Sequence, residues 1–226
     1  MENKQRQKIS NGVKLMDKLS LLLILAMIVM AFYFYGQLPD RVISHWGANG
    51  QADGYSSKNF HIYFFPFLTI ALYLLFKYLP KIDPKRKNYK QFDISYHAFR
   101  LVMIFFFVAM FALTSFINIG YQINMSVAVS SMIGVLFIFI GFIIKDIKQN
   151  WFMGIRTPWT LSNENVWKKT HMFAQKIFIF CGFIFIALPY LPVQYFSYYI
   201  IAIIILVSLG TYGYSYWLYK KEDSSK

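Results

Sequence analysis

Residues 19–35 read LSLLLILAMIVMAFYFY and contain no charged side chain. A helix rises 1.5 Å per residue, so a run of this length approaches the ~30 Å thickness of the hydrocarbon core of a bilayer. Five further runs have the same character. The sequence therefore predicts an all-α integral membrane protein with six transmembrane helices, at Leu19–Tyr35, Ile62–Tyr78, Leu101–Ile119, Val127–Ile144, Ile177–Leu191 and Tyr198–Tyr219. The first run leads into aromatic residues rather than a small-residue cleavage site, so we interpret it as a retained anchor.

The composition supports this interpretation. Of the 226 residues, 57% are hydrophobic and only 15% are charged, which excludes an ordinary soluble globule. The single cysteine, Cys181, lies inside the fifth run, so no intramolecular disulfide and no cysteine-based metal cluster are expected. No Asp, Glu, Lys, Arg or His occurs within the six runs as bounded above. Because proton and ion pathways usually place ionisable groups at membrane depth, this disfavours a pump or a proton-coupled transporter.

The basic residues predict the orientation of the chain. They gather at the N-terminus, in the second and fourth loops and in the tail. Arg41 and Lys58 are the two exceptions among the 23 Lys and Arg. The positive-inside bias then places both termini in the cytoplasm. The N-terminal and C-terminal groups are Lys4, Arg6, Lys8, Lys14 and Lys18, and Lys220, Lys221 and Lys226. The net charge of +13 thus needs no nucleic-acid partner, and membrane lipids are the expected partners of the basic loops.

Each loop outside the membrane is shorter than the ~40 residues that an unaided soluble core needs. We therefore expect two membrane modules, an N-terminal module over residues 1–98 and a second over residues 99–226. The spans contain a few polar groups, for which hydrogen bonds between helices are favoured over a substrate pathway. These are Thr114, Ser115, Asn118, Ser208, Thr211 and Ser215. Ser126, Ser130 and Gly134 line one helix face at a spacing of four, which predicts close packing within the molecule.

The first outer loop, residues 38–58, is rich in turn formers. Asn49-Gly50 and Asp53-Gly54 each favour positive φ, so the chain is expected to double back twice and to fold compactly. His45 and Asp53 are too few for a zinc site, which needs three or four ligands. Hydrogen bonds from these two side chains to the turn backbone are the preferred expectation, and no metal site or other cofactor is predicted.

The last inner loop is the other distinctive segment. Pro158 disfavours helix at Thr157, so residues 154–161 are expected to be irregular, with Ser162 as the N-cap of the next helix. That helix should run from Asn163 into the fifth span. It would then place Trp167, Thr170, His171 and Ala174 on one face. Arg156 is suited to bind a carboxylate or phosphate, or to stack on a tryptophan; bracing of the loop at the membrane interface is an equally good interpretation.

Both loops resemble the SdpI family of membrane immunity proteins. The outer-loop pattern, which resembles the N-terminal domain of unknown function in that family, is Leu38-Pro39, His45-Trp46, Gly50, Asp53 and Lys58. The inner-loop pattern is more specific and comprises Asn150, Gly154-Ile155-Arg156-Thr157-Pro158-Trp159-Thr160, Trp167 and Thr170-His171.

The resemblance implies immunity to a secreted peptide toxin that acts on the bacterial membrane. It further implies signalling through capture of a small transcriptional repressor at the membrane. The residues expected to contact toxin or a partner on the outer side are His45, Trp46, Asn49, Gly50, Asp53 and Lys58. Those expected to form a partner-binding or structural motif on the inner side are Asn150, Gly154, Arg156, Thr157, Pro158, Trp159, Trp167 and His171.

Three other functions are weighed against immunity. A transporter of the toxin would move it in a gradient-dependent way, and a sensor without protection would capture a repressor without changing survival. A membrane enzyme is not expected, because the acid–base candidates His45 and Asp53 are predicted outside, whereas Glu164 and His171 are predicted inside. Groups separated by ~30 Å of bilayer do not share one active site.

Cysteine labelling tests the predicted orientation. After replacement of Cys181 by alanine, a cysteine at Gln51 should react with a membrane-impermeant maleimide in intact cells. A cysteine at Ser162 should react only after permeabilisation, because the charge bias puts that loop in the cytoplasm. Labelling of both positions from the same side would contradict the topology.

Overall fold

The structure is a computed structural model that describes residues 2–224, apart from the side chains of residues 2–6 and 8. Within the basic groups named above, the side chains of Lys4, Arg6 and Lys8 and the whole of Lys226 lie outside the described residues. The elements are seven α-helices, two strands and three short 3₁₀ helices over the described part of the chain.

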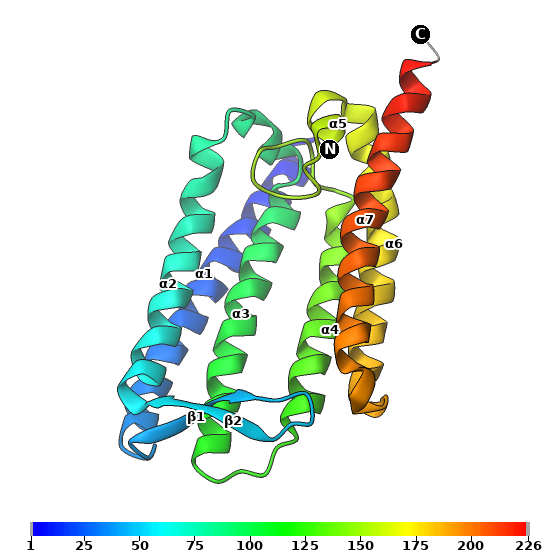
Figure 1. Cartoon of the computed structure of the whole chain (residues 1–226). Helices are drawn as coiled ribbons and strands as arrows, with labels where there is room; N and C mark the ends of the chain where they lie inside the picture. Colours follow the sequence, from blue (N-terminus) through cyan, green and yellow to red (C-terminus); the bar gives the residue numbers. More distant parts are fainter. Residues whose placement is uncertain (1, 225–226) are drawn as a thin grey trace. The chain divides into compact units, whose positions relative to one another are not determined.

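Helices make up most of the secondary structure (Figure 1). Their bounds are α1 Glu2–Tyr35, α2 Lys58–Ile82, α3 Asp93–Asn118, α4 Met125–Ile144, α5 Pro158–Ser162, α6 Glu164–Ala187 and α7 Phe196–Asp223. The 3₁₀ helices are η1 Arg86–Gln91, η2 Leu188–Tyr190 and η3 Val193–Tyr195. Within residues 2–224, six helical segments are long and apolar enough to cross a membrane, which confirms the predicted all-α fold with six spans. The cytoplasmic location of the termini stays a prediction.

The helices extend beyond the apolar runs, which corrects one expectation. α2 begins at Lys58 and α3 at Asp93, so His61 and Arg100 lie inside spanning helices. Both are almost fully buried. His61 pairs through Nε2 with the hydroxyl of Ser115 at 3.0 Å, and Arg100 donates to Asp17 Oδ1 at 2.6 Å. A polar group can extend a helix beyond its apolar run when it finds a partner inside the protein.

The chain forms two compact units, which we describe separately. The first comprises residues 1–78 and 97–129, and the second comprises residues 79–96 and 130–226. This is a different division from the two sequence modules, whose boundary at residues 98 and 99 stays a prediction.

The core of the first unit joins α1, α2 and α3. Phe34 from α1 and Phe111 from α3 are fully buried, with ring centroids 6.2 Å apart in an edge-to-face arrangement. The His61 ring stacks on Phe111 at 5.3 Å. At another place in this core, Asp17 Oδ1 accepts hydrogen bonds from Arg100 and from the Tyr73 hydroxyl, the latter at 2.9 Å. The Tyr73 hydroxyl thus adds a further hydrogen bond to the Arg100–Asp17 ion pair.

The polar residues of the spans have more varied partners than expected. Ser115 does bind a neighbouring helix through His61. Thr114 and Thr211 instead donate to carbonyls of their own helices, and Asn118 binds the backbone of Ile43 in a strand. Hydroxyl groups can bond the carbonyl four residues earlier, so a polar side chain in a span does not require a facing helix.

In the second unit, glycines bring α4 and α6 into close contact. A Cβ added to Gly134 would overlap the carbonyl of Gly182 and the side chain of Ile186. A Cβ on Gly182 would likewise overlap the carbonyl of Gly134. Farther along, Gly141 faces Ile179 at a similarly close approach. The predicted small-residue packing at Gly134 is thus intramolecular. α6 also packs along α7, where Phe173 stacks on Tyr214 with centroids 4.2 Å apart.

Gly182→Leu should destabilise the α4–α6 contact. Backbone atoms occupy the space that the new side chain needs, and overpacking typically costs about 1–3 kcal/mol. We expect a lower melting temperature of the detergent-solubilised protein. Gly213→Leu is the matched control, because a Cβ built on Gly213 meets no side chain or neighbouring helix within 4 Å among the described residues. Equal effects of the two substitutions would contradict the proposed contact.

Candidate functional site

The outer loop folds as a β-hairpin. β1 (Arg41–Trp46) and β2 (Ala52–Ser57) are antiparallel, and the turn between them contains Gly50 at φ 77°. The predicted reversal at Asn49-Gly50 is confirmed. The second reversal, at Asp53-Gly54, is wrong, because Gly54 lies within β2 opposite His45. A Cβ on Gly54 would overlap that of His45, so the glycine serves close strand pairing rather than a turn.

His45 and Asp53 bind each other across the hairpin. His45 Nδ1 and Asp53 Oδ1 are 2.5 Å apart, and both side chains are mostly exposed. The expected hydrogen bonds to the turn backbone are therefore replaced by a side-chain pair. An exposed ion pair contributes only about 0–1 kcal/mol to stability, so the pair adds little to the fold. It leaves an imidazole and a carboxylate accessible on one face of the hairpin.

Two contacts hold the hairpin against the helices of the first unit. Asn118, at the end of α3, accepts from Ile43 N at 2.7 Å and donates to Ile43 O at 3.0 Å. Ser126, in the first turn of α4, donates to Ala48 O at 3.2 Å, and its hydroxyl lies against Gly50. The hairpin is consequently anchored both at a strand and near its tip.

The remaining outer-loop candidates are distributed along the hairpin. The side chain of Asn49 caps the turn by accepting from Gln51 N at 3.0 Å, and Trp46 pairs with Ala52 at the end of β1. Lys58 lies at the other end, where its Nζ is 3.1 Å from Asp40 Oδ1 and 5.1 Å from the centre of the Tyr35 ring. Of the six candidates, only His45 and Asp53 bind each other through their side chains.

The inner loop, in the second unit, is organised around Asn150. This side chain is fully buried. Its Oδ1 accepts from Phe152 N at 2.9 Å and from Met153 N at 2.7 Å, and its Nδ2 donates to Lys148 O at 2.9 Å and Met153 O at 3.1 Å. One amide thereby satisfies four backbone groups of a segment that has no helix or strand of its own.

Asp83 connects this loop to the segment after α2. It is 2% exposed, and its carboxylate accepts from Lys85 N, Trp151 N and the hydroxyl of Tyr89. Burial raises the pKa of Tyr89, and the hydrogen bond to Asp83 raises it further, so the phenol stays a proton donor. Three donors offset the cost of burying the Asp83 carboxylate.

Gln149 makes a second connection. Its Nε2 donates to Thr160 O at 2.6 Å and Leu161 O at 2.7 Å, and its Oε1 accepts from the Lys85 ammonium. Its own carbonyl accepts from Asn88 Nδ2 at 2.7 Å. These bonds hold η1, the inner loop and α5 as one structure within the second unit.

Gly154 and His171 meet at the point where the loop passes α6. Gly154 has φ 98°, and a Cβ added there would lie in the space of the His171 imidazole. The ring is fully buried and stacks on Trp167 with centroids 4.2 Å apart. Because Ile155 N–H donates to Nε2 at 3.1 Å, that nitrogen carries no proton, and Nδ1 donates to Trp167 O at 2.8 Å. Both ring nitrogens are thus occupied.

Thr157 and Pro158 begin the short helix α5, which corrects the expectation of an irregular segment over residues 154–161. Thr157 is the N-cap and Pro158 occupies the first helical turn, where a missing N–H costs nothing. Thr157 and Thr160 form a reciprocal capping box, and the Thr157 hydroxyl also binds Ser215 of α7 at 3.0 Å. The predicted N-cap Ser162 is wrong: Asn163 caps α6, because its side chain accepts from Asn165 N and Val166 N.

Arg156 and Trp159 have contacts that the sequence left open. Arg156 Nη1 donates to Trp151 O at 2.5 Å, which favours the bracing role over stacking. Trp159 packs against Tyr212 and Tyr216 of α7, at 4.8 and 4.9 Å between centroids. Trp167 binds Ile147 O through its indole N–H at 2.7 Å. As predicted, Trp167, Thr170, His171 and Ala174 share the buried face of α6.

Sequence reasoning missed several members of this network. They are Asp83, Tyr89 and Gln149; Thr160 and Ser215 were named in the sequence, but not as candidate site residues. Asp83 carried a signal, since it is a single acid within the basic stretch of residues 77–90. Gln149 carried no signal beyond its position next to Asn150 of the motif. Within residues 2–224, no group of three or more His, Cys, Asp or Glu is placed to hold a metal ion.

Both loops described above lie in segments that match known protein families. The model of the SdpI/YfhL protein family matches residues 146–215, which include Asn150, Gly154, Thr157, His171 and Ser215. Residues 146–215 are therefore similar to the SdpI/YfhL protein family. Residues 22–70, including the hairpin, match a domain of unknown function, DUF1648. The resemblance inferred from the two motifs is confirmed.

The SdpI/YfhL similarity extends over almost the whole chain. A protein named Immunity protein SdpI, from Bacillus subtilis strain 168, is 28% identical over 208 residues, which is 92% of this chain and 98% of that protein. No solved structure matches the chain. Together with the six apolar helices found in residues 2–224, this similarity identifies a multi-pass protein of the bacterial cell membrane.

Asn150→Ala should loosen the SdpI/YfhL loop. It removes the acceptor for two backbone N–H groups, and each buried unsatisfied group costs about 1–3 kcal/mol. We expect faster limited proteolysis within residues 151–156 and a lower melting temperature. Asn165→Ala is the control, because Asn165 is exposed and its side chain donates to the side chain of Glu222, away from the Asn150 segment. Unchanged proteolysis in the Asn150 variant would contradict the organising role of this amide.

Proposed function

We propose that this chain confers immunity to a secreted peptide toxin that acts on the bacterial membrane. The observation that carries the proposal is the similarity to Immunity protein SdpI over 92% of the chain. Because 92% of this chain is covered, the similarity includes both the hairpin and the inner loop. A shared isolated motif would carry much less weight.

The hairpin is the proposed toxin-contacting surface. It exposes an imidazole and a carboxylate at His45 and Asp53, and Arg41 lies 4.7 Å from the ring centre of the half-exposed Tyr55. Such a surface offers charged, aromatic and backbone groups to an extended or helical peptide. Trp46, Asn49, Gly50 and Lys58 are the further proposed contacts, on the side that the charge bias assigns to the exterior.

The inner loop is the proposed cytoplasmic element. Its polar network holds Trp151, 47% exposed, and Phe152, 36% exposed, beside the Arg156 guanidinium. An exposed aromatic pair next to an arginine is a composition typical of protein interfaces. Repressor capture at this surface is the signalling part of the proposal, and it is separable from immunity.

The proposed role is not enzymatic. His171, the most suggestive acid–base candidate on the inner side, has both ring nitrogens engaged by backbone groups. A general base needs a nitrogen free to receive a proton from substrate. The imidazole therefore fits a role in supporting Gly154 and the loop.

Expression in a toxin-sensitive strain tests the proposal. Cells that carry the wild-type chain should survive toxin doses that kill cells carrying the empty vector. The double variant His45→Ala, Asp53→Ala should lower the protected dose by about tenfold, which corresponds to a contact of about 1.4 kcal/mol. Asn59→Ala, an exposed polar substitution at the start of α2, should leave survival unchanged.

Protein levels in the membrane must be equal in these strains. Unchanged killing despite confirmed insertion of the wild-type chain would exclude immunity. Survival that falls when the membrane gradient is dissipated, with toxin accumulating inside or leaving the cell, would favour a transporter. Capture of a repressor without any gain in survival would favour a sensor.

A further inference from the structure

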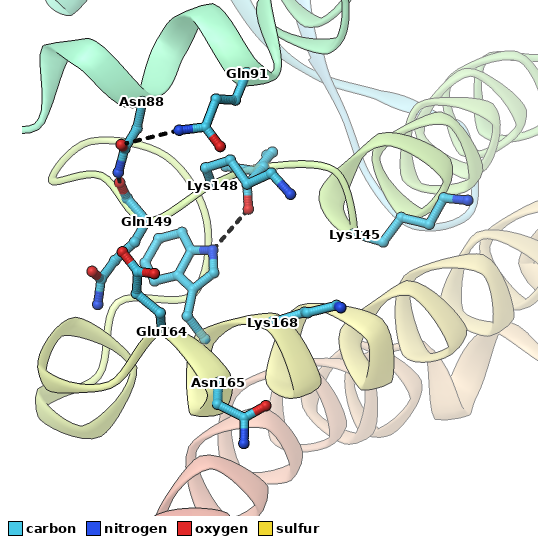
Figure 2. Close-up of a pocket in the computed structure, with 10 residues that line it drawn as sticks. Asn88, Gln91, Lys145, Lys148, Gln149, Glu164, Asn165 and Lys168 are labelled. Atoms are coloured by element: carbon cyan, nitrogen blue, oxygen red, sulfur yellow. Dashed lines mark hydrogen bonds between the residues drawn. The ribbon is translucent and has the colours of Figure 1, made fainter.

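A pocket of about 330 Å³ lies in the second unit, beside the inner loop, and shares Asn88, Gln149 and Trp167 with the hydrogen-bond network described above (Figure 2). Its walls come from η1, from the segment after α4 and from the first turns of α6. The residues that line it are Asn88, Gln91, Lys145, Ile147, Lys148, Gln149, Glu164, Asn165, Trp167 and Lys168. None of the functions considered above makes use of it.

The charged residues of the lining are mostly basic. Lys145, Lys148 and Lys168 contribute three positive charges, against the single carboxylate of Glu164. In Figure 2 the three ammonium groups lie toward one side of the pocket, and Glu164 lies toward the other with Gln149. The pocket is therefore polarised, and its lysine side is suited to an anion.

The three lysines differ from the rest of the lining in having no partner. Within residues 2–224, no hydrogen bond or ion pair engages their ammonium groups. Asn88 Nδ2 and the Trp167 indole N–H, in contrast, donate to the backbone at 2.7 Å each. The walls are thus fixed by internal bonds, whereas the positive charges remain available to a ligand.

The position of the pocket along the helices indicates the source of that ligand. Lys145 directly follows Ile144, the last residue of α4, and Lys168 lies near the start of α6 at Glu164. Both helices are long and apolar enough to span a membrane. The ends of spanning helices lie at the depth of the lipid phosphates, and basic pockets at such ends bind anionic headgroups.

We propose that this pocket binds the phosphate group of an anionic phospholipid, held by Lys145, Lys148 and Lys168. The lipid headgroup and free phosphate share this chemistry, and the position of the pocket at the helix ends favours the lipid. The proposal does not rest on immunity, and its test needs no toxin.

Native mass spectrometry of the full chain in detergent tests the site. Phosphatidylglycerol should bind saturably and more tightly than phosphatidylcholine. The triple variant Lys145→Gln, Lys148→Gln, Lys168→Gln should weaken phosphatidylglycerol binding by about 100-fold, because each basic residue contributes roughly a factor of five. The control Lys87→Gln, Lys90→Gln, Lys176→Gln changes the net charge equally at exposed positions outside the pocket, and it should weaken binding by less than about threefold.

Glu164→Gln supplies a second variant, for which the expected change in phosphatidylglycerol affinity is opposite. Removal of the one carboxylate in the lining should tighten phosphatidylglycerol binding by up to about fivefold. Gel filtration and the melting temperature confirm that each variant is folded. This variant keeps the proposal testable even if the triple substitution impairs folding.

Three results would overturn the proposal. Equal losses of phosphatidylglycerol affinity in the two triple variants would show that lipid binding depends on net charge alone. Equal binding of phosphatidylglycerol and phosphatidylcholine would exclude recognition of an anionic headgroup. Lysine-dependent binding of inorganic phosphate that displaces phosphatidylglycerol at equal concentration would assign the pocket to soluble phosphate instead of lipid.

Discussion

The hydrogen bonds of the Asn150 side chain are the interaction on which the inner loop depends. Residues 148–153 have no regular backbone pairing, yet Asn150 and Met153 are buried. Peptide groups removed from water cost free energy unless they find partners, and a single amide supplies both a donor and an acceptor. With this segment fixed, Trp151 N reaches Asp83 and Ile155 N reaches His171.

These bonds, together with buried apolar side chains such as Ile147, Met153 and Trp167, make a short loop behave as a folded element. Asp83 brings in Tyr89, and Gln149 brings in Lys85, Asn88 and the end of α5. Thr157 then connects α5 to Ser215 of α7. The loops of this chain are short, so buried polar side chains supplement the apolar packing that stabilises larger domains. This explains why so many residues of the SdpI/YfhL region are small, polar and buried.

The sequence predicts the spans well and the loops only in part. Long apolar runs signal helices directly, because lipid permits little else. Helix ends were less visible: His61 and Arg100 lie inside helices since Ser115 and Asp17, distant in sequence, satisfy them. Gly54 resembles a turn residue locally, but its pairing with His45 depends on strand register. The motif marked Asn150 and His171, whereas Asp83 and Gln149 act through contacts that local pattern does not encode.

The contact of Gly154 with the His171 ring also has an evolutionary consequence. The ring fills the volume that any side chain at position 154 would require, and the positive φ there already disfavours other residues. A larger residue at position 154 is thus compatible with the fold only if position 171 becomes smaller and Ile155 N gains another acceptor. Such a combination requires several simultaneous changes. The two positions are accordingly expected to change together among relatives or not at all.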